Sequence, residues 1–332
     1  MLDVRRLRLL RELAYRGTIA AVADALAFTP SAVSQQLSVL EREAGLALLE
    51  RRGRRVVLTP AGQNLVRHAE AVLEQLERAG AELAGARRGL SGPLRIGTFP
   101  SAGRTLIPAA LAALAREHPG LEPMISEIDP AGVAAALRAG ELDVALILEY
   151  DFAAAGPEPG LATADLCTEA MYLAAAARTP AAPAVTRATA DGTAISSARD
   201  APWITATPGT MCRQMTIRAC QAAGFTPRTR HQVDDFATTL SLVAAGQGVA
   251  LVPQLGTAGP PPGVILTRVP LARRTRIAYR RGAGAHPAVA AVTAALREAV
   301  PPELRAADDR PDQPGAGGRA ADPVVHKNES QG

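Results

Sequence analysis

Residues 29–41 read TPSAVSQQLSVLE, and this short stretch decides how the rest of the chain is interpreted. Val33, Leu37 and Leu40 are spaced to share one face of a helix, which predicts that this face is buried. Another face carries small, uncharged side chains that donate and accept hydrogen bonds: Ser31, Ser34, Gln35 and Ser38. A helix face that meets only water is usually filled with Glu, Lys and Arg. The pattern therefore predicts a helix that presents this face to a binding partner.

The neighbouring residues predict that this helix is the second of a closely spaced pair. Thr18 can cap a short helix over residues 19–26, and Thr29 followed by Pro30 is a typical helix start. Residues 3–16 precede the pair with the pattern of an amphipathic helix. Two short helices joined by a tight turn indicate a helix-turn-helix.

A basic hairpin follows the helix pair. Residues 46–62, LALLERRGRRVVLTPAG, read as two short strands around Gly53, which is typical of a wing. Its tip carries four arginines: Arg51, Arg52, Arg54 and Arg55. Residues 1–60 hold ten arginines against six acidic residues, a balance that favours a polyanion as partner. We expect these arginines to contact phosphate, although Arg51 and Arg55 could instead be solvated or pair with Glu41 or Glu43.

A long helix, over about residues 60–88, is predicted next by the cap and proline of Thr59 and Pro60. Its apolar residues repeat with the alternating spacing of a coiled-coil seam: Leu65, Ala69, Val72, Leu76, Ala79, Leu83 and Ala86. We expect this seam to join two copies of the chain. The alternative is a helix that lies on its own domain.

Beyond residue 91 the pattern changes to alternating strands and helices, which predicts an α/β fold with a parallel sheet. The predicted strands are 94–99, 121–128, 142–148, 201–207, 248–253 and 275–280. The predicted helices begin near residue 105 and then cover 133–139, 212–223, 240–245 and 287–299. Residues 301–332 are rich in Pro, Gly and Asp and are expected to form a disordered tail.

Several classes of function find no support in the sequence. No run of 18 apolar residues exists and the N-terminus has no apolar signal core, so neither a membrane span nor a secretion signal is expected and the chain is predicted to be cytoplasmic. The five histidines are scattered, and no catalytic motif, phosphate-binding glycine loop or metal-ligand cluster is present. The three cysteines suit neither a disulfide framework nor a zinc site. We expect no metal, no cofactor and no enzyme activity. An enzyme and a solute-binding protein are the alternative classes of function.

The chain resembles the LysR-type transcriptional regulators. The resemblance lies in the order and spacing of AAVADAL, TPSAVSQQLSVLEREAG, LLERRGRRVVLTPAG, LRIG, AGELDVAL and LVAAGQGVALVP, and it covers about residues 2–300. It implies a winged helix-turn-helix DNA-binding domain, a long linker helix and an effector domain of two α/β lobes, like a periplasmic binding protein. The boundaries would be 1–59, 60–90 and 91–300, with the tail at 301–332. Lobe one would be 92–162 plus 265–300, and lobe two 163–264.

The resemblance implies double-stranded DNA, a small-molecule effector and a second copy of the chain as partners. Members form dimers or, commonly, tetramers on promoter sites, where RNA polymerase is a further candidate partner. The residues expected to contact bases in the major groove are Pro30, Ser31, Ser34 and Gln35. Those expected to contact phosphates are Thr18, Thr29, Arg52 and Arg54. Many members carry Arg at the position of Gln35, so a different half-site is expected here.

The effector is expected between the lobes, at the carboxyl ends of the strands. Four residues are candidates for binding it: Ser101, Asp129, Thr205 and Thr207. Each could instead cap a helix, and an inward-pointing Asp129 would disfavour a carboxylate ligand. Some members sense peroxide through two cysteines, so Cys212 and Cys220 offer a redox alternative. Eight residues on one helix span about 12 Å, however, and a disulfide needs Cα atoms within about 7 Å, so a bridge would require local unfolding.

Overall fold

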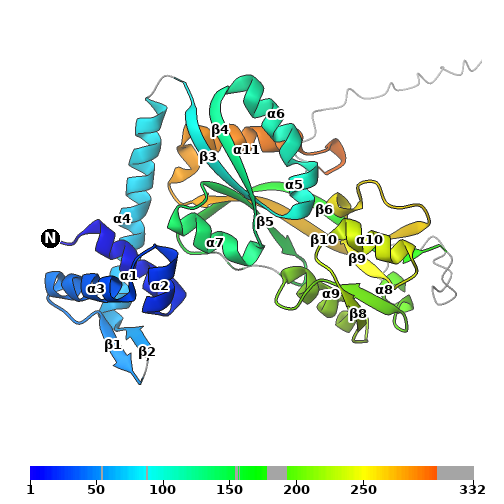
Figure 1. The fold of residues 1–332 in the computed structure, drawn as a ribbon, viewed down its shortest axis with the longest axis horizontal. Coiled ribbons are helices and arrows are strands. Elements are labelled where there is room, and N and C mark those ends of the chain that lie inside the picture. The colour runs from blue at the N-terminus through cyan, green and yellow to red at the C-terminus, as the bar shows by residue number, and fades with distance from the viewer. Residues whose placement is uncertain (54, 87–88, 154–155, 157, 178–192, 305–332) are drawn as a thin grey trace, which may run out of the picture.

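The N-terminal part of the computed structural model has the predicted helices and hairpin (Figure 1). The structure describes residues 1–332 except 54, 87–88, 154–155, 157, 178–192 and 305–332. Helices α1 (Val4–Arg16), α2 (Ile19–Ala25) and α3 (Pro30–Ala44) are followed by strands β1 (Leu49–Arg52) and β2 (Arg55–Leu58). The two strands pair in antiparallel register, from Leu49 with Leu58 to Arg52 with Arg55.

The helix starts follow from the capping residues. The side chains of Asp3, Thr18 and Thr29 accept hydrogen bonds from backbone N–H groups in the first turns of α1, α2 and α3. Val33, Leu37 and Leu40 are buried, as their spacing predicted, and they pack against α1 and α2 in one core. The turn between α2 and α3 contains Ala27 at φ 53°, a left-handed conformation that a residue with a Cβ rarely adopts.

Helix α4 (Pro60–Gly85) connects this unit to the rest of the molecule and ends three residues earlier than predicted. Its predicted seam has two environments. Ala69 is fully buried in the core of the N-terminal unit and Leu65 packs against that core, so this first part lies on its own domain. Val72, Leu76 and Leu83 are 40%, 50% and 71% exposed, so an apolar stripe further along α4 is uncovered within one chain.

The remainder is built on one mixed sheet of six strands in the order β4-β3-β5-β10-β6-β9. The strands are β3 (Ser91–Thr98), β4 (Gly120–Glu127), β5 (Val144–Tyr150), β6 (Leu161–Ala176), β9 (Ala250–Pro253) and β10 (Val264–Arg280). Within this six-stranded sheet, the predicted parallel pairing is correct only for β3, β4 and β5. Strand β10 runs antiparallel to β5 and β6, and β6 runs antiparallel to β9. The prediction failed because the long pair β6 and β10 was not recognised, except for the last residues of β10.

Strands β6 and β10 run through both lobes (Figure 1). Residues 273–279 of β10 pair with β5, whereas its first half pairs with the part of β6 that also pairs with β9. We call lobe one the part with β3, β4 and β5, and lobe two the part with β9 and the short parallel sheet of β7 (Pro202–Thr205) and β8 (Arg228–Gln232). The register of β10 shifts between Val269 and Ala272, where the strand passes from one lobe to the other.

Helices cover the sheets of both lobes (Figure 1). Those of lobe one are α5 (Pro100–Thr105), α6 (Ile107–Glu117), α7 (Pro130–Ala139) and α11 (Pro287–Ala299). Those of lobe two are α8 (Thr193–Ser197), α9 (Met211–Ala222) and α10 (Phe236–Ala244). Three short 3-10 helices complete the described chain: η1 (Gln254–Thr257), η2 (Ala283–Ala285) and η3 (Pro302–Leu304). The main core includes Trp203 of lobe two, which is fully buried and is the single tryptophan of the chain.

The N-terminal unit and α4 dock on lobe one. Arg8 donates through Nη2 to the carbonyls of Arg138 and Ala139 at the C-terminal end of α7, at 3.2 and 2.6 Å. Arg280 pairs with Glu77 of α4 at 2.8 Å. Gly282 lies so close to α4 that a Cβ built on it would stand 2.5 Å from the carbonyl oxygen of Glu74. A side chain at this position would therefore push α4 away from lobe one.

Candidate functional site

The uncharged face of α3 is open to solvent. Pro30, Ser31, Ser34 and Gln35 are all exposed. Thr29 and Ser31 bond to each other at 3.0 Å, and Thr29 also caps α3. Within the described part of the chain, the side chains of Ser34 and Gln35 form no hydrogen bond with other protein groups. Short polar side chains on an exposed helix can reach the edges of bases in a major groove, and Gln pairs well with adenine.

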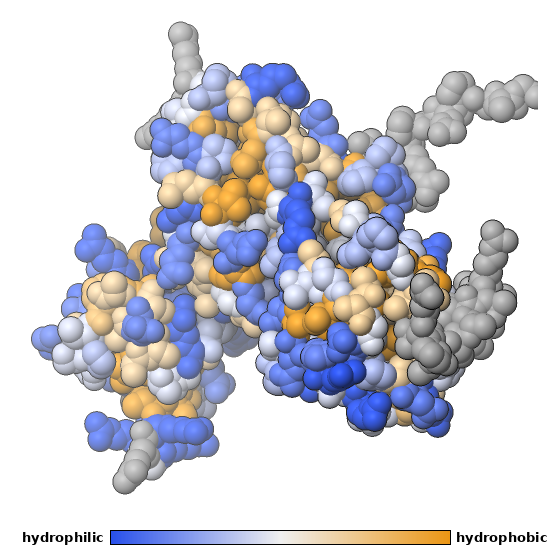
Figure 2. All heavy atoms as spheres, turned by 45° about the vertical axis from the view of Figure 1, so that its right-hand side comes forward, coloured by the Kyte–Doolittle hydropathy of each residue, from blue (hydrophilic) through white to orange (hydrophobic). Residues whose placement is uncertain are grey.

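The wing brings positive charge beside this face. Arg51, Arg52 and Arg55 are exposed, and Figure 2 shows the hydrophilic residues gathered around the wing tip at lower left. Arg52 pairs with Glu50 at 2.8 Å, but its side chain is 76% exposed, so the pair contributes little and leaves the guanidinium accessible. Arg54 lies outside the described residues. Thr18 is exposed and its hydroxyl caps α2 by accepting from the backbone N–H of Ala21.

Arg51 and Arg55 are exposed, and the alternative in which they pair with Glu41 or Glu43 is wrong. Glu41 instead accepts hydrogen bonds from the backbone N–H groups of Leu48 and Leu49, both at 3.0 Å, and so ties α3 to the start of the wing. Glu43 pairs with Arg6 of α1. Both carboxylates therefore hold the N-terminal unit together and leave Arg51 and Arg55 exposed.

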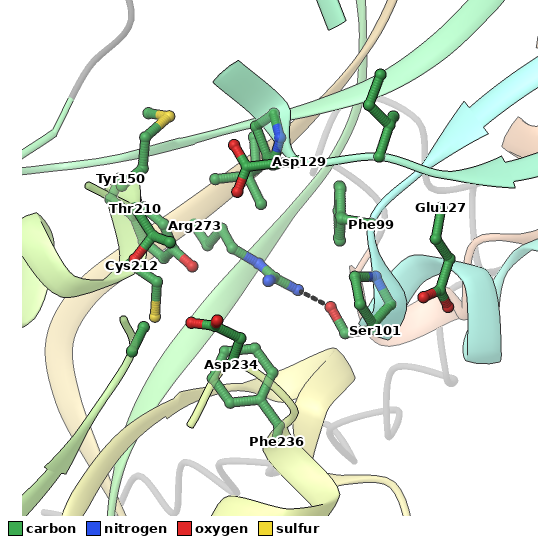
Figure 3. Close-up of a pocket in the computed structure, with 16 residues that line it drawn as sticks. Phe99, Ser101, Glu127, Asp129, Tyr150, Thr210, Cys212, Asp234, Phe236 and Arg273 are labelled. Atoms are coloured by element: carbon green, nitrogen blue, oxygen red, sulfur yellow. Dashed lines mark hydrogen bonds between the residues drawn. The ribbon is translucent and has the colours of Figure 1, made fainter. Parts of the chain in front are cut away.

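A cavity of about 270 Å³ lies between the two lobes (Figure 3). Its walls come from the loops after β3, β4, β7 and β8, from the starts of α7 and α9, and from β5 and β10. Much of the lining is apolar: Phe99, Pro100, Ile128, Leu148, Met211 and Phe236. Apolar walls with a few polar groups are typical of a small-molecule site.

A buried ion pair forms the floor of the cavity. Arg273 of β10 is 1% exposed and donates through Nε to Glu169 of β6, which is fully buried, at 2.6 Å. Its Nη2 donates to Ser101 at 3.0 Å (Figure 3), and its guanidinium lies 5.0 Å from the ring centre of Phe99. Burial alone would lower the pKa of Arg273, but the Glu169 carboxylate holds that pKa above its ordinary range. Glu169 also accepts from the backbone N–H of Leu255 at 2.6 Å.

The structure brings two of the four predicted effector residues together on the cavity wall, Ser101 and Asp129. Asp129 also caps α7 by accepting from the backbone N–H of Ala131 at 2.8 Å. Thr205 lies behind the wall: it is 3% exposed and accepts a hydrogen bond from Arg213 at 2.8 Å. Thr207 is not on the cavity wall, but its hydroxyl donates a hydrogen bond to Asp234, which does line the cavity.

Sequence reasoning missed Arg273, Glu169, Tyr150 and Asp234. The first two belong to the long strands that were not recognised, and β10 contains five arginines with no pattern that marks one as buried. An acidic residue within an apolar-rich strand, as at Glu169, was the one available signal. Tyr150 is buried at the end of β5 beside Arg273 and Cys212, and burial raises its pKa.

The three cysteines form no disulfide in the structure. Cys212 lines the cavity and Cys220 is fully buried, both on α9. Burial raises the pKa of Cys212 above its ordinary value and that of Cys220 to about 12. Because the thiolate is the reactive form, both thiols are poor nucleophiles in this conformation.

The described residues contain neither a metal-binding cluster nor a membrane-spanning helix. Within them, no grouping of three or more histidine, cysteine or carboxylate side chains could hold a metal ion. No helix in the same part of the chain has the length and apolar character needed to cross a membrane.

Comparison with known proteins gives two matching family models. The one described as LysR substrate binding domain matches residues 87–301, and the one described as bacterial regulatory helix-turn-helix protein, lysR family, matches residues 4–63. Among curated relatives, the chain is 31% identical over 249 residues to a probable hydrogen peroxide-inducible genes activator of Mycobacterium avium, which is 75% of this chain and 76% of the relative.

Solved structures agree with these models. The Corynebacterium glutamicum OxyR C206 mutant aligns with a TM-score of 0.54 at 26% identity and covers 90% of this chain and 92% of its own. Full-length CbnR complexed with its target DNA aligns with a TM-score of 0.51 at 22% identity, over 90% of this chain and 100% of the other. The predicted fold class, a winged helix-turn-helix followed by a two-lobed α/β domain, is confirmed.

Proposed function

Since the chain belongs to the LysR family of DNA-binding transcriptional regulators, we propose that it binds an inverted-repeat promoter site as a dimer or tetramer and responds to a small molecule in the interlobe cavity. The observation that carries the proposal is the exposed, uncharged face of α3 beside an arginine-rich wing. A regulator needs no catalytic group, so the proposal includes no enzyme activity.

The residues proposed to contact DNA divide into two groups, one for bases and one for phosphates. Pro30, Ser31, Ser34 and Gln35 would lie in the major groove, where hydrogen bonds to base edges read sequence. Phosphate contacts, which set the position of the protein without reading sequence, would come from Thr18, Thr29, Arg52 and Arg54. The exposure of the described members of both groups supports this assignment.

Self-association would use the exposed part of α4. Val72, Leu76 and Leu83 are large apolar side chains left open to solvent, and a second α4 with the same spacing would cover them. Ala79, exposed on the same stripe, would allow close approach. Leu65 and Ala69 would act indirectly, by fixing α4 on its own domain. We propose domain limits of 1–59, 60–90 and 91–300, supported by the positions of α4 and β3.

The effector would occupy the interlobe cavity and contact Ser101 and Asp129. Thr205 and Thr207 would act from behind the wall, through Arg213 and Asp234. Because β6 and β10 join the lobes, a ligand that touches both lobes can change their relative position. That change is what the DNA-binding unit docked on lobe one would sense.

The test is in vitro selection of bound duplexes from a random pool with the full chain, followed by titration of the selected duplex at several salt concentrations. We expect an inverted repeat and a steep salt dependence. Gln35→Ala should change preference at one base pair by about 1–3 kcal/mol, whereas Arg52→Ala should weaken all sequences alike and flatten the salt dependence. Gln214→Ala, an exposed helical glutamine of lobe two, is the matched control. A uniform loss for both variants would contradict the groove assignment.

Peroxide sensing is a second candidate, favoured by the relative described as a peroxide-inducible genes activator. It would oxidise Cys212 and Cys220 to a disulfide, with peroxide reduced to water. Both lie on α9, about 12 Å apart along the helix axis, so α9 would have to unfold. Mass spectrometry of the peroxide-treated full chain checks this: an intramolecular disulfide that a Cys220→Ser variant cannot form would support the second candidate over the first.

A further inference from the structure

Three carboxylates lie on the wall of the interlobe cavity: Glu127, Asp129 and Asp234. All three are exposed, so they stand at the rim, where a ligand would meet them. Asp129 is held by the backbone N–H of Ala131, and Asp234 accepts from both the N–H and the hydroxyl of Thr207, at 2.8 Å each. Figure 3 shows Asp129 and Asp234 on opposite sides of the Arg273 guanidinium. Neutral donors orient these carboxylates without cancelling their charge.

Among the described residues that line the cavity, Arg273 is the one cation, and its charge does not compensate for the three carboxylates. Arg273 lies at the floor, 1% exposed, and its charge is matched by the buried carboxylate of Glu169 at 2.6 Å. A ligand carboxylate that bonded to Arg273 would compete with Glu169 and would have to pass the three rim carboxylates first. Like charges within a few ångströms disfavour each other strongly in a partly desolvated site.

Helix dipoles do not reverse this balance. Helix α7 begins at the cavity, but the carboxylate of Asp129 caps its positive end. Helices α9 and α5 also begin there: α9 has the neutral cap Thr210, and the first residues of the short helix α5, Pro100 and Ser101, line the cavity. An exposed helix N-terminus contributes roughly half a positive charge, so α5 and α9 together still contribute less than the charge of the three carboxylates. The field at the rim is therefore negative.

We infer that the effector is a small organic cation, with an amine or similar group held between Asp129 and Asp234 and an apolar body against the walls. This deepens the proposed function, and rests on it. The apolar part would meet side chains such as Phe99, Ile128, Met211 and Phe236. A cavity of about 270 Å³ is at the small end of ligand sites, so the body is no larger than a single ring with a short chain.

The test compares three probes of nearly equal size that differ in charge: benzylamine, benzyl alcohol and benzoate. Dissociation constants for the full chain are measured by ligand-observed NMR titration at low and high salt. We expect benzylamine to bind about tenfold more tightly than benzyl alcohol at low salt, and benzoate more weakly than both. The advantage of the amine should shrink at high salt, because the rim charges are exposed.

Asp129→Asn removes one charge and keeps the helix cap, since Asn caps as well as Asp. It should weaken benzylamine about fivefold and leave benzyl alcohol unchanged. Asp3→Asn makes the same change at the cap of α1, outside the cavity, and should alter neither. Benzoate binding as tightly as benzylamine would overturn the inference, and so would binding of none of the three. The selection of DNA duplexes does not depend on the dissociation constants of the probes. Failure of the selection would therefore refute the proposed function, whereas the ranking of the three probes would still test the charge of the ligand.

Discussion

Removal of one partner from the buried pair of Arg273 and Glu169 is the sharpest test of the effector domain. The two side chains are 1% and 0% exposed, so water cannot solvate either charge when its partner is removed. Arg273→Met would leave the Glu169 carboxylate buried without its cation and deprive Ser101 of a donor. Breaking a pair this deeply buried costs about 3–5 kcal/mol of the free energy of unfolding.

The same reasoning predicts a partial rescue. In the double variant Arg273→Met, Glu169→Gln no charge remains buried, and the Gln carbonyl can still accept from the backbone N–H of Leu255. Since replacing a whole buried pair by neutral groups is often nearly neutral in stability, we expect the double variant to recover at least about 2 kcal/mol of the loss. Glu169→Gln alone should be as costly as Arg273→Met, because it leaves the guanidinium unpaired.

Urea unfolding of the full chain, followed by the fluorescence of Trp203, measures these differences. Trp203 is the single tryptophan of the chain, is fully buried, and lies in the same core as Met171 of β6 and Val269 of β10. Arg116→Met is the control, because its pair with Glu117 is 62% and 52% exposed and should contribute less than about 1 kcal/mol. A loss no larger than that of the control, or a double variant as unstable as Arg273→Met, would refute the reasoning.

Three further predictions concern backbone fit and burial. Ala27→Gly should stabilise the chain by about 0.5–1 kcal/mol in thermal unfolding, because φ is 53° there; a loss of stability would contradict this. Gly282→Ala should cost about 1–3 kcal/mol more than Gly263→Ala, since both glycines have positive φ but only Gly282 meets α4; equal losses would mean that α4 does not dock there. Burial raises the pKa of Cys220 from 9.0 to about 12, so the folded state keeps the proton longer and stability should fall as pH rises from about 9 toward 12; Cys220→Ala should reduce this fall.

The DNA-binding unit was predictable because its determinants are local. The caps Thr18 and Thr29, the spacing of Val33 and Leu37, and the turn signals of the wing each act within a few residues. The prediction that failed in this unit concerned which side chains pair with each other. No local pattern shows that Glu41 accepts from the N–H groups of Leu48 and Leu49 and is therefore not available to an arginine of the wing.

The cavity was less predictable because it is assembled from distant segments. Ser101 was found by its place after a strand, yet its partner Arg273 is 172 residues further on, and Glu169 lies 104 residues before Arg273. Local pattern cannot tell which arginine of β10 points inward, because that depends on the register with β6, and the register shifts at Val269 and Ala272. The charge of the ligand was likewise open at Asp129, and our inference of a cationic ligand rests also on Asp234, which the structure places beside the same cavity. Chemistry that depends on long-range strand pairing therefore needs the fold, whereas chemistry presented on one helix face can be read from spacing.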